Sequence, residues 1–175
     1  MRNETRAIVL ACTGLLLLAG AGPVGAASDP GPRGVKQAHR AVVIAHRATE
    51  RAKAAERESR ATESATRAYS SRYGAPVGRW VYAARRAGFT WSQLGTLFPI
   101  MLRESGGDPR AKNPSSTASG LGQFLAFFWD GSDSYFRSLF RKYHLAYPWN
   151  PFDGWQNLLH WRVVVKELGW VPWQL

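Results

Sequence analysis

Glu104 is the side chain of this sequence best suited to acid–base chemistry. It ends an apolar segment, and the glycines and proline that follow it cannot continue a helix. Successive helical residues lie roughly 100° apart, which places Glu104 between Leu97 and Ile100 on the apolar side. Hydrocarbon neighbours disfavour the ionised form of a carboxyl, so the position suits a proton donor. The alternatives are an ion pair with Arg103 or Arg110, or a solvated helix end.

A helix that begins near Thr90 is predicted to position this carboxyl. Thr90 and Gln93 have the spacing of a capping box, in which each side chain accepts a hydrogen bond from the other residue's backbone. Apolar residues then recur at helical spacing, at Leu94, Leu97, Phe98, Met101 and Leu102. Pro99 lies inside the segment and is predicted to kink the helix, because it removes one backbone hydrogen bond. The helix would therefore hold Glu104 at its end, beside a loop.

A longer motif surrounds Glu104. Residues 104–109 read Glu-Ser-Gly-Gly-Asp-Pro, Ala111, Asn113 and Ala118 follow, and residues 120–124 read Gly-Leu-Gly-Gln-Phe. This string resembles the signature of the lytic transglycosylase (SLT) and goose-type lysozyme-like family. The resemblance covers roughly residues 91–173 and is poor over 130–153. It implies an α+β, predominantly α, lysozyme-like fold that cleaves the β-1,4 bond between N-acetylmuramic acid and N-acetylglucosamine in peptidoglycan.

The same resemblance implies the roles of the site residues. Glu104 would be the catalytic acid that protonates the glycosidic oxygen and then acts as a base. The substrate-binding residues that it implies are Ser105, Gln123, Phe124, Trp129, Tyr147 and Asn157. For the Ser105 hydroxyl the alternative is a helix-capping role, and for the three aromatic residues it is packing in the core. Gly122 stands where the family carries Met, which removes a packing contact.

A glycosidase that uses two carboxylates needs a second Asp or Glu facing the scissile bond. The candidates, none of which has a motif around it, are Asp108, Asp130, Asp133, Asp153 and Glu167. The lack of a second catalytic carboxylate fits a lytic transglycosylase. In that reaction the substrate's own acetamido group and 6-hydroxyl act as nucleophiles and give a 1,6-anhydro product. A hydrolytic muramidase of the same fold and a non-catalytic cell-wall-binding protein remain as alternatives.

Composition divides the chain into three parts. Residues 1–27 begin with arginines, continue with an apolar run too short for a comfortable membrane span, and end in small residues, as a cleaved signal peptide does. Residues 28–74 form a Pro/Gly linker and a basic, Ala/Arg/Glu-rich segment predicted to be a helical arm. Residues 75–175, rich in aromatics, would form the catalytic domain. This organisation predicts a secreted protein, extracellular or associated with the cell wall.

The formal charge of +11 on 175 residues predicts an anionic partner. The arm would hold the enzyme against anionic wall polymers, or else serve only as a spacer. Nucleic acid is disfavoured because the arm lacks interleaved aromatics for base stacking. Stable membrane insertion is not expected after leader cleavage. The protein is expected to be a monomer. Neither the aspartates at 130 and 133 nor the four histidines have metal-site spacing, so no metal or cofactor is predicted.

Further helices are predicted over residues 78–87, 135–143 and 155–168, with a short one over 124–129. The loop over residues 108–122 is rich in Pro, Ser and Gly, and a short hairpin is possible within it. Such a loop beside a helix-end carboxyl would provide one wall of a sugar-binding cleft.

Overall fold

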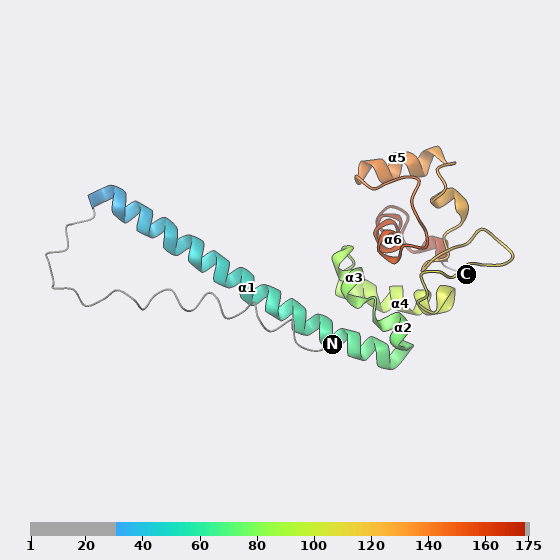
Figure 1. The fold of residues 1–175 in the computed structure, drawn as a ribbon, viewed down its shortest axis with the longest axis horizontal. Helices are drawn as coiled ribbons and strands as arrows, with labels where there is room; N and C mark the ends of the chain where they lie inside the picture. Colours follow the sequence, from blue (N-terminus) through green and yellow to red (C-terminus); the bar gives the residue numbers. More distant parts are fainter. Residues whose placement is uncertain (1–30, 174–175) are drawn as a thin grey trace. The chain divides into compact units, whose positions relative to one another are not determined.

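The computed structural model describes residues 31–173, so the predicted signal peptide over residues 1–27 lies outside the described residues. Its helical elements are α1 (Gly31–Tyr73), α2 (Ala75–Gly78), α3 (Val81–Arg86), α4 (Trp91–Ser105), the 3-10 helix η1 (Ala126–Phe128), α5 (Ser134–Lys142), α6 (Gly154–Leu168) and the 3-10 helix η2 (Val171–Trp173) (Figure 1). The described residues contain no strand, only isolated bridges that join Ser119 to Lys112 and to Phe124. The predominantly helical prediction is confirmed, whereas the β part of the predicted α+β class amounts to these bridges.

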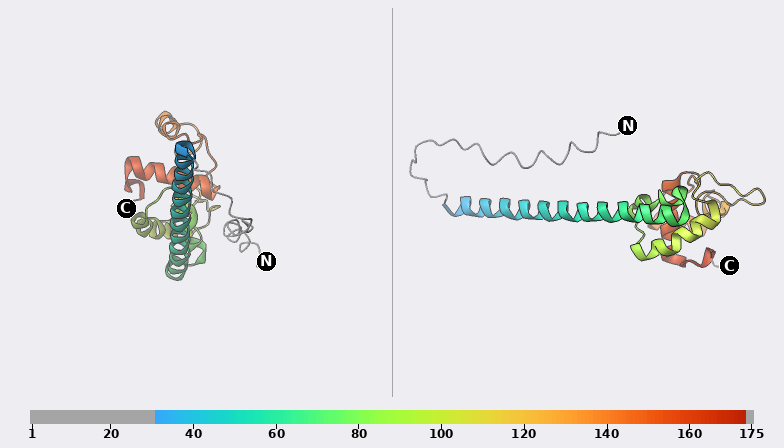
Figure 2. Two further views of the ribbon diagram at one scale, coloured as in Figure 1. Left: turned by 90° about the vertical axis from the view of Figure 1, so that its left-hand side faces the viewer. Right: turned by 90° about the horizontal axis from the view of Figure 1, so that it is seen from below.

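The chain divides into two compact units at Thr49 and Glu50. Figure 2 shows α1 as one unbroken helix, and its described side chains before residue 50 are almost all exposed. Beyond residue 50 the helix belongs to the second unit: Thr62 is buried, and the Tyr69 ring lies 4.7 Å from the Phe98 ring of α4. The predicted boundary between the arm and the catalytic domain, at residue 75, would therefore cut the last turns of α1 away from the core on which they pack.

The core of the second unit is formed by α4 and α6 together with the aromatic residues of the loops and of α5. α4 packs against α2 and α3, and α3 also packs against α6. Trp161 of α6 and Phe98 and Met101 of α4 are fully buried. Phe124, from the loop before η1, places its ring edge-on to Trp161 at 6.0 Å. These contacts fix the loop over residues 120–124 relative to both long helices.

The predicted start and end of α4 are confirmed, and four of its five regularly spaced apolar residues are buried, whereas Leu102 is 45% exposed. Thr90 is the N-cap, and both hydrogen bonds of the capping box are present. The helix ends at Gly106, which adopts the left-handed conformation with φ 61°, as a glycine can without the cost of a side chain. Pro99 lies inside the helix, which continues past it to Ser105.

The other predicted helices are confirmed with one difference. α5 and α6 cover the expected ranges, with Asp133 and Asp153 as their N-caps, and η1 occupies the middle of the expected short helix. The helix predicted over residues 78–87 begins later, at Val81, as α3, and the short helix α2 precedes it, with a break at Arg79 and Trp80 between the two. At the break, the Trp80 indole N–H donates to the Gly107 carbonyl oxygen at 2.9 Å, so a tertiary contact forms next to the break.

Candidate active site

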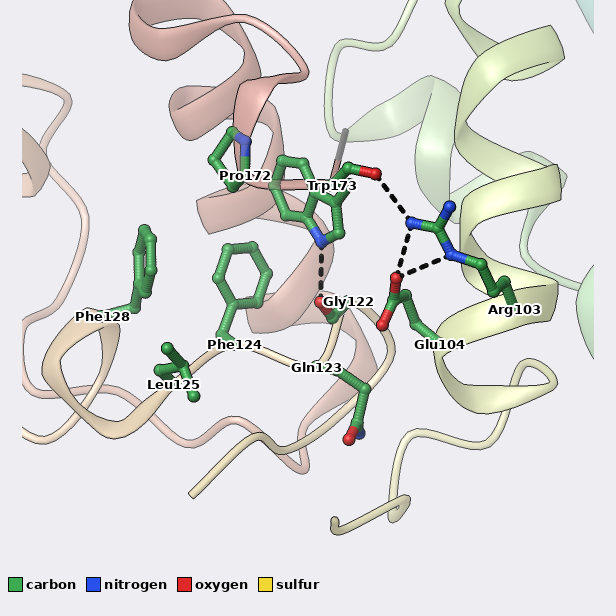
Figure 3. Close-up of a pocket in the computed structure, with 9 residues that line it drawn as sticks. All are labelled: Arg103, Glu104, Gly122, Gln123, Phe124, Leu125, Phe128, Pro172 and Trp173. Atoms are coloured by element: carbon green, nitrogen blue, oxygen red, sulfur yellow. Dashed lines mark hydrogen bonds and ion pairs between the residues drawn. The ribbon is translucent and has the colours of Figure 1, made fainter. Parts of the chain in front are cut away.

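Glu104 lines a cavity of about 210 Å³ at the C-terminal end of α4. The lining residues are Arg103, Glu104, Gly122, Gln123, Phe124, Leu125, Phe128, Pro172 and Trp173 (Figure 3). They come from three segments that are distant in the sequence: the end of α4, the loop leading into η1, and η2. The predicted catalytic residue and two of the predicted substrate-binding residues thus meet in one pocket.

The Glu104 carboxylate is half-buried, with 22% of its side chain exposed, and is paired with its neighbour Arg103. Its Oε1 atom accepts hydrogen bonds from Arg103 Nη2 at 2.8 Å and from Arg103 Nε at 3.1 Å. The expectation that hydrocarbon alone surrounds this carboxyl is therefore wrong, and the alternative of an ion pair with Arg103 is what the structure contains. Glu104 nevertheless faces a pocket whose other walls are mostly apolar.

Trp173 and Gly122 form the wall opposite α4. The Trp173 indole N–H donates to the Gly122 carbonyl oxygen at 2.8 Å. A β carbon at Gly122 would lie 2.9 Å from the Phe124 ring and 3.0 Å from the Trp161 ring, closer than ordinary van der Waals contact allows. The packing contact expected to be lost at this position is therefore replaced by aromatic rings, which leave no room for a side chain.

Ser105 lies at the end of α4 but does not line the pocket. Its hydroxyl is within hydrogen-bonding distance of the carbonyl oxygens of Met101 (3.2 Å) and Leu121 (2.9 Å), and it accepts from the Gly107 N–H at 3.2 Å. These bonds correspond to the capping alternative and also join the helix end to the loop that carries Gly122 and Gln123. A role near the acetamido group stays a prediction.

Gln123 lines the pocket through a backbone in the left-handed region, with φ 49°. Its side-chain amide extends away from the Arg103–Glu104 pair (Figure 3) and donates to the carbonyl oxygens of Gly120 at 3.0 Å and Ala111 at 3.2 Å. The amide thus holds the loop together, and a substrate contact by this side chain stays a prediction.

The three aromatic residues differ in their placement. Phe124 is 2% exposed and packs edge-on against four rings, with one edge toward the pocket. Trp129 and Tyr147 do not line the pocket. The Trp129 indole N–H donates to the Phe124 carbonyl oxygen at 3.0 Å, and the Tyr147 hydroxyl donates to the Phe127 carbonyl oxygen at 2.9 Å. All three make the structural contacts that the core-packing alternative describes.

Asn157 is fully buried on α6 and supports the pocket from behind. Its Oδ1 accepts from the Gly122 N–H at 3.3 Å, and its Nδ2 donates to the Pro151 carbonyl oxygen at 3.0 Å. Both amide atoms are therefore used to fix the loop, and Asn157 does not line the cavity; a substrate contact by this residue stays a prediction.

Glu104 is the one carboxylate among the residues that line this cavity. Asp108, the nearest candidate in sequence, is exposed, and its Oδ1 accepts from the Arg110 backbone N–H at 2.8 Å in a local turn. Asp133 and Asp153 cap helices, and Glu167 binds Lys142 and Tyr143. Within residues 31–173, no three His, Cys, Asp or Glu side chains are grouped so as to hold a metal ion.

Sequence reasoning missed four residues of the pocket wall: Leu125, Phe128, Pro172 and Trp173. It treated Arg103 only as an ion-pair partner, although Arg103 also reaches the Trp173 carbonyl oxygen at 2.8 Å, across 70 residues of sequence. The spacing of neighbouring residues in the sequence cannot predict a contact over this separation. Trp170 and Trp173 were an available signal, because large aromatic side chains carry much of the burial of a small domain; the structure buries Trp173 and partly buries Trp170.

Comparisons with protein-family models, with curated proteins and with solved structures found no match to this chain. In the described part of the chain, none of the helices combines the length and the apolar character needed to cross a bilayer.

Proposed function

We propose that this chain is a peptidoglycan lytic transglycosylase. It cleaves the β-1,4 bond between N-acetylmuramic acid and N-acetylglucosamine and leaves 1,6-anhydro-N-acetylmuramic acid ends. Glu104 protonates the glycosidic oxygen and then removes the proton from the 6-hydroxyl as that oxygen attacks the anomeric carbon. The observation that carries the proposal is a half-buried Glu104 in a pocket that is also lined by residues 122–124, which belong to the second part of the motif.

The number of carboxylates in the pocket favours this reaction over hydrolysis with two carboxylates. Retaining and inverting glycosidases of that type place a second carboxyl group across the bond, about 5–10 Å from the first. Glu104 is the single acidic residue in the cavity lining, and Asp108 is engaged in a turn outside it. A nucleophile supplied by the substrate itself agrees with this arrangement. A hydrolytic muramidase with the same acid is the alternative to be tested.

The decisive variant is Glu104→Gln, which keeps the size of the side chain and removes its acid–base function. We expect the purified variant to lose clearing of peptidoglycan in a zymogram, because no other carboxyl in the pocket lining can replace the proton donor. Circular dichroism should show an unchanged fold, since the substitution keeps the size of a partly exposed side chain at a helix end and costs little stability. Equal clearing by both proteins would remove the proposed mechanism.

Product analysis separates the two reactions. Mass spectrometry of peptidoglycan digested by the wild-type chain should show 1,6-anhydro ends. Reducing ends would assign the hydrolytic reaction to the same pocket, and binding to the wall without either product would support the non-catalytic alternative.

The location and the wider partner follow from the same proposal. A secreted enzyme acting on peptidoglycan would meet anionic wall polymers, and the exposed residues of α1 before residue 50 carry basic side chains at Arg33, Lys36, Arg40 and Arg47. Such a surface attracts polyanions, and the attraction weakens as salt screens it.

A further inference from the structure

Arg103 joins the predicted acid to η2. Its Nη2 atom lies 2.8 Å from Glu104 Oε1 and 2.8 Å from the carbonyl oxygen of Trp173, and its Nε donates to the same Oε1 at 3.1 Å. One guanidinium therefore bridges the end of α4 and the segment that forms the opposite wall of the cavity (Figure 3). Trp173 is itself held to Gly122 through its indole N–H.

The two carboxylate oxygens of Glu104 have different hydrogen-bond partners. Oε1 accepts both hydrogen bonds from Arg103, whereas Oε2 accepts none from any side chain or backbone group of the described residues. Because the guanidinium is planar, two N–H groups that point at one oxygen fix the direction of the carboxylate as well as its distance. Oε2 is then the oxygen available to carry the proton that is transferred.

We propose that Arg103 is a positioning residue for this reaction. It holds Glu104 by Oε1 so that Oε2 faces the scissile oxygen, and it keeps Pro172 and Trp173 in place as the far wall of the pocket. This inference rests on the proposed function, because it specifies how the acid of that reaction is oriented. Positioning matters because displacing a catalytic group by about 1 Å can reduce the rate about 100-fold.

The alternative is an ordinary surface ion pair without a role in the reaction. Arg103 is 49% exposed, and exposed ion pairs contribute little to stability. The melting temperature should therefore change little whichever account is right. The values of kcat and KM distinguish the positioning role from the surface ion pair, since a group that orients the acid affects the chemical step more than substrate binding.

The test compares Arg103→Met and Arg103→Lys with a matched control, Arg162→Met. Arg162 also donates to a backbone carbonyl oxygen, that of Gly88 at 2.8 Å, but it does not line the pocket. With soluble glycan strands as substrate, we expect Arg103→Met to lower kcat by about 10- to 100-fold while KM changes far less. Arg103→Lys keeps the charge without the planar fork and should recover part of the loss, and the control should match the wild type.

Glu104→Gln, assayed beside them, separates this inference from the proposed function. If Glu104→Gln is inactive and Arg103→Met keeps the wild-type kcat, the positioning role is overturned and the proposed function stands. If Glu104→Gln remains active, the proposed function falls. Should Arg103→Met fail to fold, Arg103→Lys decides: a wild-type kcat in that variant overturns the positioning role, and a reduced kcat at unchanged melting temperature supports it.

Discussion

At the scale of single residues, the pocket depends on positions where a side chain cannot be added. Gly120 has φ 78°, in the left-handed region, and a β carbon there would overlap the Pro151 carbonyl oxygen and the Asn157 amide nitrogen. Asn157 in turn binds the Gly122 N–H. Gly120 therefore permits the close approach of α6 and the loop on which the shape of the pocket depends.

Two glycine substitutions are predicted to have opposite effects on stability. Gly120→Ala should lower the free energy of unfolding by about 2–4 kcal/mol, because it adds both backbone strain and overlap. Gly95→Ala should raise it by about 0.5–1 kcal/mol, because Gly95 lies in α4, where a β carbon meets nothing within 4 Å. Urea unfolding followed by tryptophan fluorescence measures both. Similar losses in the two variants would contradict the account of Gly120.

How much of the site could be predicted from the sequence depended on how local each signal is. Glu104 and the residues around Gln123 were singled out because they belong to one motif, whose parts lie within about twenty residues of each other. The partner of Glu104 was left open, since an arginine next to a carboxyl in sequence can point in several directions. The contact of Arg103 with Trp173 could not be predicted, because it depends on where η2 packs after the whole unit has folded.

At the scale of elements, helices with strong local caps were predicted well. α4 was predicted from its capping box, and α5 and α6 from the spacing of their apolar residues. In the structure all three begin at residues whose side chains accept hydrogen bonds from the first turn, a feature that a sequence can show. The break between α2 and α3 has no such marker. It lies where Trp80 reaches the Gly107 carbonyl oxygen and packs on Gly154, and this tertiary contact competes with a continuous helix.

Composition also did not predict that the last turns of α1 pack on the core, because few of their residues are apolar. The Tyr69 ring packs on Phe98, burial raises the pKa of Tyr69, and Glu58 forms an ion pair with Arg85 of α3 at 3.0 Å. A few well-placed aromatic side chains can therefore attach a mostly polar helix to a core.

Two truncated chains test which part of α1 the second unit needs. A chain that begins at Glu50 should keep the melting temperature of the full chain, because the described residues before it are exposed. A chain that begins at Ala75 should melt at least about 5 °C lower, since a loss of about 1 kcal/mol shifts a domain of this size by that much. Tyr69→Ala in the full chain should reproduce part of the loss. An unchanged melting temperature in the shorter chain would show that these turns do not support the core.

At the scale of the whole unit, a buried histidine connects α6 to the aromatic core. His160 is 1% exposed, and its ring stacks on Trp149 at 4.2 Å and lies edge-on to Phe140 at 4.5 Å. Its two ring nitrogens lie 2.7 Å from the Gln156 carbonyl oxygen and 2.9 Å from that of Ala146. A neutral imidazole has one N–H, so it can donate to only one of the two. Burial nevertheless dominates and lowers the pKa of His160 below its usual 6.5, while the two backbone hydrogen bonds oppose the change.

This lowered pKa predicts that the unit becomes less stable on mild acidification. The unfolded chain takes up a proton near the usual histidine pKa of 6.5, whereas the folded chain resists it. The contribution is therefore complete above that pH and is lost as the pH falls from there through the lower pKa of the folded state. Glu167, whose pKa the hydrogen bond from Tyr143 lowers from the usual 4.5, stays ionised throughout this window and does not contribute there.

Urea unfolding at pH values of about 7.5, 6.5 and 5.5 measures the effect. The wild-type free energy of unfolding should fall across this series, and His160→Gln, which removes the titrating group, should show a shallower dependence on pH even though its stability is lower at every pH. Comparing slopes rather than absolute stabilities separates protonation from the loss of ring packing against Trp149. Equal slopes in the two proteins would mean that acid sensitivity, if present, arises from other groups, and that the aromatic core tolerates a charged His160.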